Sequence, residues 1–152
     1  MASRSEAPQA DSPFWWVWER FTSLHTNLYK LSRGHVGGSL RGCEIALVES
    51  VGRKSGKRRT HPLMCREEDG NLVIVASKGG IDRHPAWYLN LTAHPETVAW
   101  WHGRKRRVRM RETSGDERER LWELMCEVWP AYRGYQRRTD RQIPVMVLEP
   151  AG

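Results

Sequence analysis

The chain of 152 residues is 39% hydrophobic and 28% charged, which is typical of one globular domain and excludes a disordered chain. No apolar stretch of about 18 residues could span a membrane and no secretion signal opens the sequence, so a cytoplasmic location is expected. Its odd number of cysteines argues against a disulfide framework, and the formal charge of +7 predicts an anionic partner, which could be nucleic acid, an acidic membrane surface or a phosphorylated cofactor.

The start of the chain predicts a tail and then a helix. Residues 1–12 are small and polar, and we expect them to be disordered. Ser12-Pro13 is typical of a helix start, and apolar residues recur at helical spacing as far as Leu31. This amphipathic helix, predicted over residues 13–33, either packs on the body of the protein or touches a membrane surface through Trp15 and Trp16.

Residues 34–152 are predicted to form the domain itself. Apolar residues from Ile45 to Val48 indicate a first strand, and further strands are predicted over 58–66 and 72–76. Two turn signals separate the three strands, a basic glycine-rich turn and then Asp69-Gly70, a strong hairpin signal. A short helix is expected over 85–93.

The second half of the chain predicts two more strands, a helix and a last strand. A strand over 98–101 is followed by one in which Val108 and Met110 face one way and arginines face the other. Ser114 and Glu117 form a capping-box pattern at a helix that ends at Pro130, and the last strand covers 143–148. Six short strands with early hairpins predict a mainly β fold with helices packed outside an antiparallel barrel-like sheet, not a parallel sheet.

Two loops could bind an anion. Glycines in the turn 52–57 let backbone N–H groups approach a ligand beside Arg53, Lys54 and Lys57, although a solvated hairpin turn fits the pattern equally well. The segment 77–80 follows an apolar strand. There Ser77 could donate to a ring carbonyl, Lys78 could pair with a phosphate or carboxylate, and two glycines allow close approach.

Two aromatic groups accompany these loops. The helix over 85–93 carries Asn90, which suits a helix interior poorly and could bind a ligand. Tyr132 and Tyr135 share one side of a helical turn and could stack on a substrate, relay a proton or belong to the core. No metal-binding spacing or serine nucleophile elbow is found, so the chemistry is expected to come from an organic cofactor.

Four stretches, 51–59, 73–80, 84–91 and 135–150, resemble the deazaflavin (F420)-dependent nitroreductase family, class A flavin/deazaflavin oxidoreductases of actinobacteria. The resemblance covers roughly residues 14 to 150. It implies a split β-barrel that binds coenzyme F420 in a groove. It also implies hydride transfer from the reduced deazaflavin to a quinone, menaquinone-like, or to a nitroaromatic or nitroimidazole substrate.

The resemblance also implies a set of site residues. The phosphate and oligoglutamate tail would be held by Arg53, Lys54, Ser55 and Arg59, and the deazaflavin would be lined by Pro62, Ala76, Ser77, Lys78, Gly79, Trp87, Tyr88 and Asn90. Ser77, Tyr132 and Tyr135 would orient the substrate or supply a proton. Met64 and Trp129 stand where the nitroimidazole-activating member has tyrosines, so cofactor binding is expected to carry over and prodrug activation is not.

Other functions remain open from the sequence. FMN on the same fold is one alternative, although its single phosphate needs fewer basic residues at the turn. A protein that holds F420 without turnover is another. Nucleic-acid binding through Arg104 to Arg111 is disfavoured, because strand alternation marks these residues as a solvated face. The chain is expected to be a monomer or a homodimer.

Overall fold

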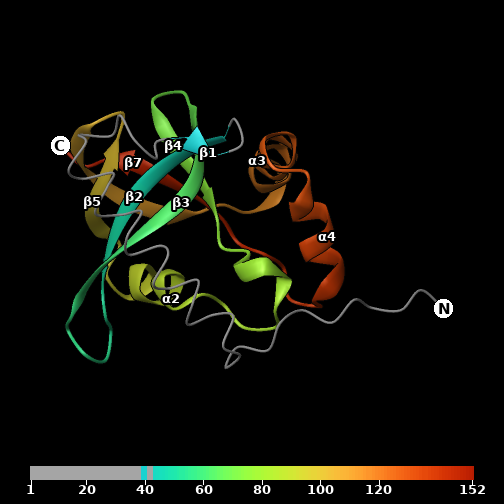
Figure 1. The fold of residues 1–152 in the computed structure, drawn as a ribbon, viewed down its shortest axis with the longest axis horizontal. Helices are drawn as coiled ribbons and strands as arrows, with labels where there is room; N and C mark the ends of the chain where they lie inside the picture. Colours follow the sequence, from blue (N-terminus) through green and yellow to red (C-terminus); the bar gives the residue numbers. More distant parts are fainter. Residues whose placement is uncertain (1–38, 41–42) are drawn as a thin grey trace.

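A closed antiparallel barrel forms the body of the protein. The computed structural model describes residues 39–40 and 43–152, so the predicted tail 1–12 and helix 13–33 lie outside the described residues. Figure 1 shows six strands that pair in one circuit, with the short β1 (Ser39–Leu40) added on β2. The circuit runs β2 (Cys43–Val51), β3 (Arg58–Glu68), β4 (Asn71–Val75), β7 (Val145–Pro150), β6 (Arg104–Glu112) and β5 (Glu96–Trp101), which returns to β2.

Strand alternation decides which residues enter the barrel. Ala46 and Val48 of β2 lie inside, and so do Val108 and Met110 of β6, all buried in one apolar cluster. The arginines between and beside Val108 and Met110 are exposed, as the alternating pattern predicts. The predicted mainly β fold with a six-stranded antiparallel barrel is therefore confirmed.

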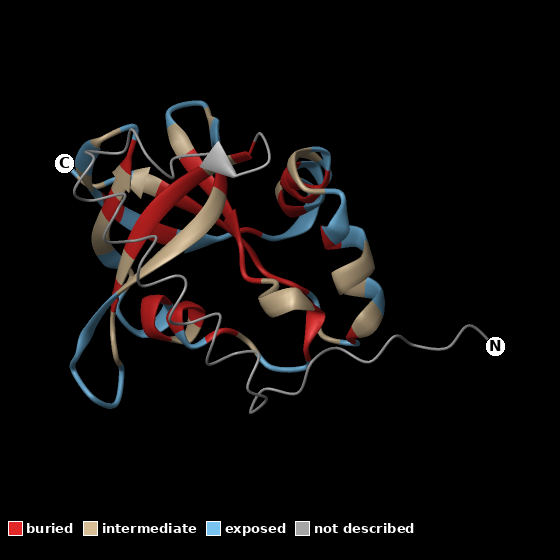
Figure 2. Cartoon of the chain, viewed as in Figure 1, coloured by how far each residue is buried: buried red, intermediate tan, exposed pale blue. Residues whose placement is uncertain are grey.

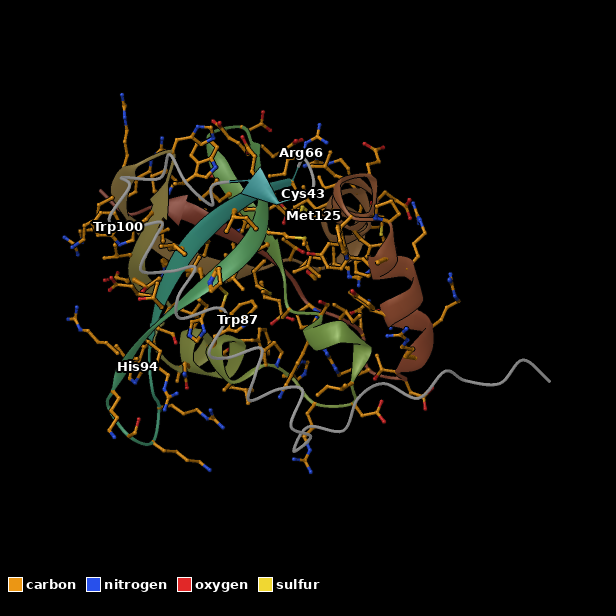
Figure 3. The ribbon with its side chains drawn as sticks, viewed as in Figure 1. Cys43, Arg66, Trp87, His94, Trp100 and Met125 are labelled. Atoms are coloured by element: carbon orange, nitrogen blue, oxygen red, sulfur yellow. The ribbon has the colours of Figure 1, made fainter. Side chains whose placement is uncertain are left out.

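The helices occupy two different places. The helices α3 (Gly115–Val128) and α4 (Ala131–Arg138) cover the outer faces of β4 and β7, where a second buried cluster forms. Cys43 at the start of β2 lies beside α3 and donates to the carbonyl oxygen of Val128 at 3.0 Å (Figure 3).

The short helix α2 (Ala86–Ala93) is the exception to the prediction that helices pack outside. Its Trp87, Tyr88 and Leu91 belong to the cluster that fills the barrel, so α2 plugs one end of it (Figures 1 and 2). A single 3₁₀ turn, η1 (Lys78–Gly80), precedes it after β4.

One local prediction was wrong. The helix α3 begins next to Ser114 as expected, but the Ser114 side chain makes no capping hydrogen bond. Glu117 pairs instead with Arg111 on β6, where the guanidinium also meets Glu149. The Glu117 carboxylate that the capping box would use is thus bound by Arg111 through both of its oxygens, a bidentate arrangement that an arginine fork favours. The stretch around Tyr132 and Tyr135, left without a helix or strand assignment, is the helix α4.

Candidate functional site

The turn between β2 and β3 projects into solvent with its cations exposed (Figure 2). Gly52 donates to the carbonyl oxygen of Lys57 at 2.8 Å, and Gly56 closes the turn with φ +68°. A Cβ atom on Gly52 would meet Ser55 Oγ at 2.3 Å, and that hydroxyl accepts from the Lys57 N–H at 3.2 Å. Ser55 therefore shapes the turn, and its hydroxyl hydrogen is left for a ligand.

Positive charge at the turn is not neutralised. Within the described residues, no ion pair involves Arg53, Lys54, Lys57 or Arg59, and Arg58 only approaches Glu49 at 3.9 Å. Elsewhere in the described residues, several glutamates pair with other arginines: Glu96 with Arg109, Glu117 and Glu149 with Arg111, Glu68 with Arg120, and Glu123 with Arg133. The unpaired cations give the turn a field that favours an anion with several charges.

A hydrogen-bonded chain lies beneath the turn. The side-chain oxygen of Asn90, on α2, accepts from the backbone N–H of Arg53 at 3.1 Å and from its guanidinium at 3.3 Å. The Asn90 amide nitrogen donates to Ser50 Oγ at 3.4 Å, and Ser50 Oγ lies 2.8 Å from Nε2 of His61. Asn90 thus binds the turn itself. At the other end of the hydrogen-bonded chain, burial lowers the pKa of His61 to about 4, with a smaller contribution from the nearby charge of Arg59.

The loop after β4 has the backbone of an anion-binding nest. Lys78, Gly79 and Gly80 all have positive φ, at 45°, 65° and 82°. Among the described residues, no hydrogen bond is formed by the N–H groups of Ser77, Lys78 and Gly79. Successive unpaired N–H groups in such a conformation form a concavity that binds anions.

Arg141 fixes this loop from behind. Its guanidinium donates to the carbonyl oxygens of Ile81 at 2.9 Å, Ser77 at 2.8 Å and Ala76 at 3.3 Å, and to His84 Nδ1 at 3.2 Å. Because arginine can only donate, Nδ1 of His84 accepts and its proton lies on Nε2. The loop carbonyls are therefore held on the side of Arg141, which leaves the N–H groups for a ligand.

The helix α4 closes the loop from another side. Arg138 donates to the carbonyl oxygen of Gly79 at 3.3 Å. A Cβ atom at Gly80 would lie 2.4 Å from the carbonyl oxygen and 2.7 Å from the Cα atom of Tyr135, so only glycine allows this approach. The predicted Ser77–Gly80 segment therefore adjoins the predicted tyrosine segment in space.

Two predicted cofactor contacts are mainly packing residues. Trp87 and Tyr88 are each 8% exposed, and Figure 3 shows Trp87 on the helix α2 that plugs the barrel. The Tyr88 hydroxyl donates to Glu112 at 2.7 Å, and burial with this partner raises the pKa of Tyr88 to about 12. Burial beside Arg141 lowers the pKa of His84, whose ring lies 4.7 Å from that of Tyr88.

The predicted pocket tyrosines differ from each other. Tyr132 is 5% exposed and packs against Trp122 in the core, and burial raises its pKa. Tyr135 is half-buried, edge-on to Tyr132 at 6.1 Å, and its hydroxyl accepts from Trp129 Nε1 at 3.5 Å. Tyr135 and Trp129 are therefore the members of this group that reach toward the surface.

Strand register places the predicted β3 residues. The side chains of His61 and Leu63 face the barrel interior, where His61 meets Ser50 and Leu63 packs against the apolar cluster. Because side chains alternate along a strand, Pro62 and Met64 face outward. There they lie beside Leu47 and Ile45 of β2. Ala76 is fully buried in the interior, and a ligand could meet only its backbone.

The structure also contains residues that the sequence did not single out. Ser50, His61 and Arg141 hold the turn 52–57 and the loop 77–80 through hydrogen bonds to residues 11 to 65 positions away. None of them shows a periodic or motif signal. Only the polar Ser50 at the end of an apolar strand could have hinted at such a role.

A second group of cations, residues 104–107, lies at the other end of the barrel, where His102 meets Glu44. Lys105 stacks on Trp100 and Arg106 on Trp101, with distances to the ring centroids of 5.4 and 5.1 Å. A cation therefore lies over one face of each of these two indoles, at the position where a stacked base would lie. In the described part of the chain no cluster of three potential metal ligands occurs, and no helix there could cross a membrane.

Comparison with known proteins gives a consistent match. Residues 21–150 fit the family model described as F420H(2)-dependent quinone reductase. Rv3178 of Mycobacterium tuberculosis, provisionally named an F420H(2)-dependent quinone reductase, is 38% identical over 104 residues, which cover 68% of this chain and 87% of that protein.

Two solved structures are also similar. A structure described as an F420-H2 dependent reductase (FDR-A) is 44% identical with a TM-score of 0.64, and the match covers 69% of this chain and 93% of that one. A structure described as a domain-swapped dimer is 38% identical with a TM-score of 0.65, covering 91% of this chain and all of that one.

Replacing Arg141 by lysine is predicted to destabilise the protein by about 2 to 4 kcal/mol, because an ammonium group cannot replace four hydrogen bonds from one planar fork. Urea unfolding measures the loss. The exposed Arg137 on α4 supplies the control, and Arg137→Lys should stay within about 0.5 kcal/mol of the wild type. Equal stability of the two variants would contradict the role given to Arg141.

The lowered pKa of His61 predicts a pH dependence of stability. The unfolded chain binds the proton with a pKa of 6.5 and the folded chain with one of about 4. Stability is therefore full above pH 6.5, falls as pH drops toward 4 and levels off below. Between pH 7 and pH 5 the free energy of unfolding should fall by about 2 kcal/mol from this group. The variant His61→Gln should lose less over the same interval, while His84 contributes equally to both proteins. Parallel curves would show that His61 is not the neutral, buried group described.

Proposed function

The chain belongs to the F420H(2)-dependent quinone reductase family, and from this premise we propose that its two anion-binding segments hold coenzyme F420 for reduction of a quinone. Two observations on the part of the chain that the structure describes support this proposal: the cations of the turn 52–57 form no ion pair there, and the N–H groups of residues 77–79 form no hydrogen bond there. The helix α2 lies between these segments (Figure 1). A cofactor with a phosphate and an oligoglutamate tail has the charge that such a surface favours.

The residues present fit this cofactor. Arg53, Lys54 and Arg59 are exposed and unpaired, so they can meet carboxylates without first breaking an ion pair. Ser55 retains a hydroxyl donor at the same turn. The nest at Ser77–Gly79 offers donors to a phosphate or to ring carbonyl oxygens. FMN, with one phosphate, would leave most of the turn unused.

Bound reduced F420 would supply a hydride. The protein's part is to orient the acceptor and manage one proton. Ser77 is half-buried at the nest, and its hydroxyl can donate to a ligand. Tyr135, half-buried beside Trp129, can wall the pocket and donate through its hydroxyl. The buried Tyr132 has a raised pKa, which makes it a weaker acid, so we assign it to supporting Tyr135.

A quinone is the proposed acceptor. The outward-facing Met64 and the half-buried Trp129 give the pocket apolar and flat surfaces, which suit a hydrophobic ring system. Neither offers a hydroxyl to a polar nitroimidazole. Turnover of nitroaromatic compounds is therefore expected to be slower than turnover of menaquinone analogues.

Assembly and location complete the proposal. We propose a homodimer, because a structure that matches 91% of this chain is described as a domain-swapped dimer. Membrane contact through the helix predicted over residues 13–33 would bring the enzyme to a lipid-soluble quinone. That segment lies outside the described residues, so this part rests on the sequence alone.

Cofactor identity is tested by fluorescence titration with F420 and, in parallel, with FMN. The expected result is micromolar or tighter F420 binding and much weaker FMN binding. Reduced F420 should then be oxidised in the presence of a menaquinone analogue. Tight FMN binding with no response to F420 would contradict the proposal.

Charge at the turn predicts a salt dependence. Lys54→Ala and Lys78→Ala should weaken F420 binding about three- to tenfold in about 0.02 M salt and distinctly less in about 0.5 M salt, because salt already screens the exposed pairs. Lys105→Ala, on the second group of cations, is the matched control and should leave the affinity unchanged. Losses that do not depend on salt would argue against a bound anionic tail.

A further inference from the structure

The hydrogen-bonded chain beneath the basic turn has one consistent arrangement of protons. Asn90 presents its oxygen to two Arg53 donors, so its NH₂ group faces Ser50 and donates. Ser50 Oγ accepts that bond, and its own hydrogen is left for Nε2 of His61. Nε2 is therefore unprotonated, and the ring proton lies on Nδ1. Each of the contacts from Arg53 through Asn90 and Ser50 to His61 then joins one donor to one acceptor.

Burial makes the hydrogen-bonded chain of Asn90, Ser50 and His61 rigid. Ser50 is 1% exposed and Asn90 is 5% exposed. Leaving a buried polar group without its partner is costly, so these groups favour a single geometry. The three side chains come from β2, β3 and α2, which are themselves fixed by the barrel. Arg53, at the exposed end of this hydrogen-bonded chain, donates to the Asn90 side-chain oxygen from both its backbone N–H and its guanidinium.

Asn90 also suits the charge requirement of the turn. A neutral amide oxygen holds the Arg53 guanidinium at 3.3 Å without cancelling its charge. A carboxylate at this position would hold it more strongly but would compete with an anionic ligand. Only one guanidinium nitrogen is used, and the remaining N–H groups stay free to bind.

We propose that Ser50 and His61 are positioning residues that act through Asn90 and preorganise the anion-binding turn without touching the cofactor. The inference rests on the proposed function for the identity of the ligand. Holding Arg53 before the ligand arrives removes part of the ordering cost of binding. The effect is confined to the phosphate and glutamate tail, because the deazaflavin ring is assigned to the nest and β3.

A matched pair of His61 variants tests the proposal. Glutamine can place an acceptor near the position of Nε2, whereas phenylalanine keeps the ring without any acceptor. Ser50→Ala removes the next link of the chain. The buried Thr113, whose hydroxyl donates to the Val145 carbonyl at 2.8 Å far from the turn, supplies Thr113→Val as a control for loss of a buried hydrogen bond.

The first readout needs no ligand. Amide hydrogen exchange at Arg53 should be about tenfold faster in His61→Phe and Ser50→Ala than in the wild type, and near the wild-type rate in His61→Gln and Thr113→Val. Unchanged Arg53 exchange in both His61→Phe and Ser50→Ala would overturn the proposal. If His61→Phe does not fold, Ser50→Ala alone decides.

The second readout compares F420 with the deazaflavin ribityl core that lacks the phosphate and tail. His61→Phe and Ser50→Ala should weaken F420 binding about tenfold and leave binding of the truncated ligand within about twofold. Equal weakening for both ligands would overturn the positioning role. Failure of the wild type to bind F420 would overturn the proposed function instead, while amide exchange at Arg53 would still decide whether the chain organises the turn.

Discussion

The position of the helix α2 in the end of the barrel is the constraint on which the site depends. Trp87, Tyr88 and Leu91 bury their side chains among the strands, which fixes the rotation of the helix. With that face inside, Asn90 meets Ser50 and Arg53. The residues leading into the helix bring His84 to Arg141, which also holds the nest. The short apolar helix α2 therefore links the turn 52–57 to the loop 77–80, although neither of these two segments has an apolar core of its own.

Charge is distributed so that the two binding segments remain free. Within the described residues, arginines of β6, α3 and α4 pair with Glu68, Glu96, Glu117, Glu119, Glu123 and Glu149. The turn is held by the neutral Asn90 amide, and the nest is held by the guanidinium groups of Arg141 and Arg138. Neutral and cationic partners fix a geometry without lowering the positive potential, which suits a site for a polyanion. A site built from ion pairs would have to break them before binding.

The sequence predicted the barrel well because local signals were strong. Val108 and Met110 alternate with arginines, and Asp69-Gly70 turns a hairpin with positive φ at both residues. It also located the turn and the Ser77–Gly80 loop, because glycine and charge are local features. The supports of the site were missed, since Arg141 acts on Ala76 across 65 positions and leaves no periodic trace. Asn90 was recognised as unusual, but only the structure shows its oxygen bound to Arg53. The capping box failed for the same reason, because Arg111 offered Glu117 a partner from another strand.

The central claim is that the turn 52–57 and the nest 77–80 bind one cofactor on the two sides of α2. Mapping backbone amide chemical shifts on addition of F420 tests this most directly, because the nest N–H groups form no hydrogen bond among the described residues. The predicted result is a set of large shifts at Gly52–Lys57 and Ser77–Gly80 that saturate together, with little change at residues 104–107. Shifts confined to residues 104–107, or saturation of the two segments at different F420 concentrations, would contradict a single site.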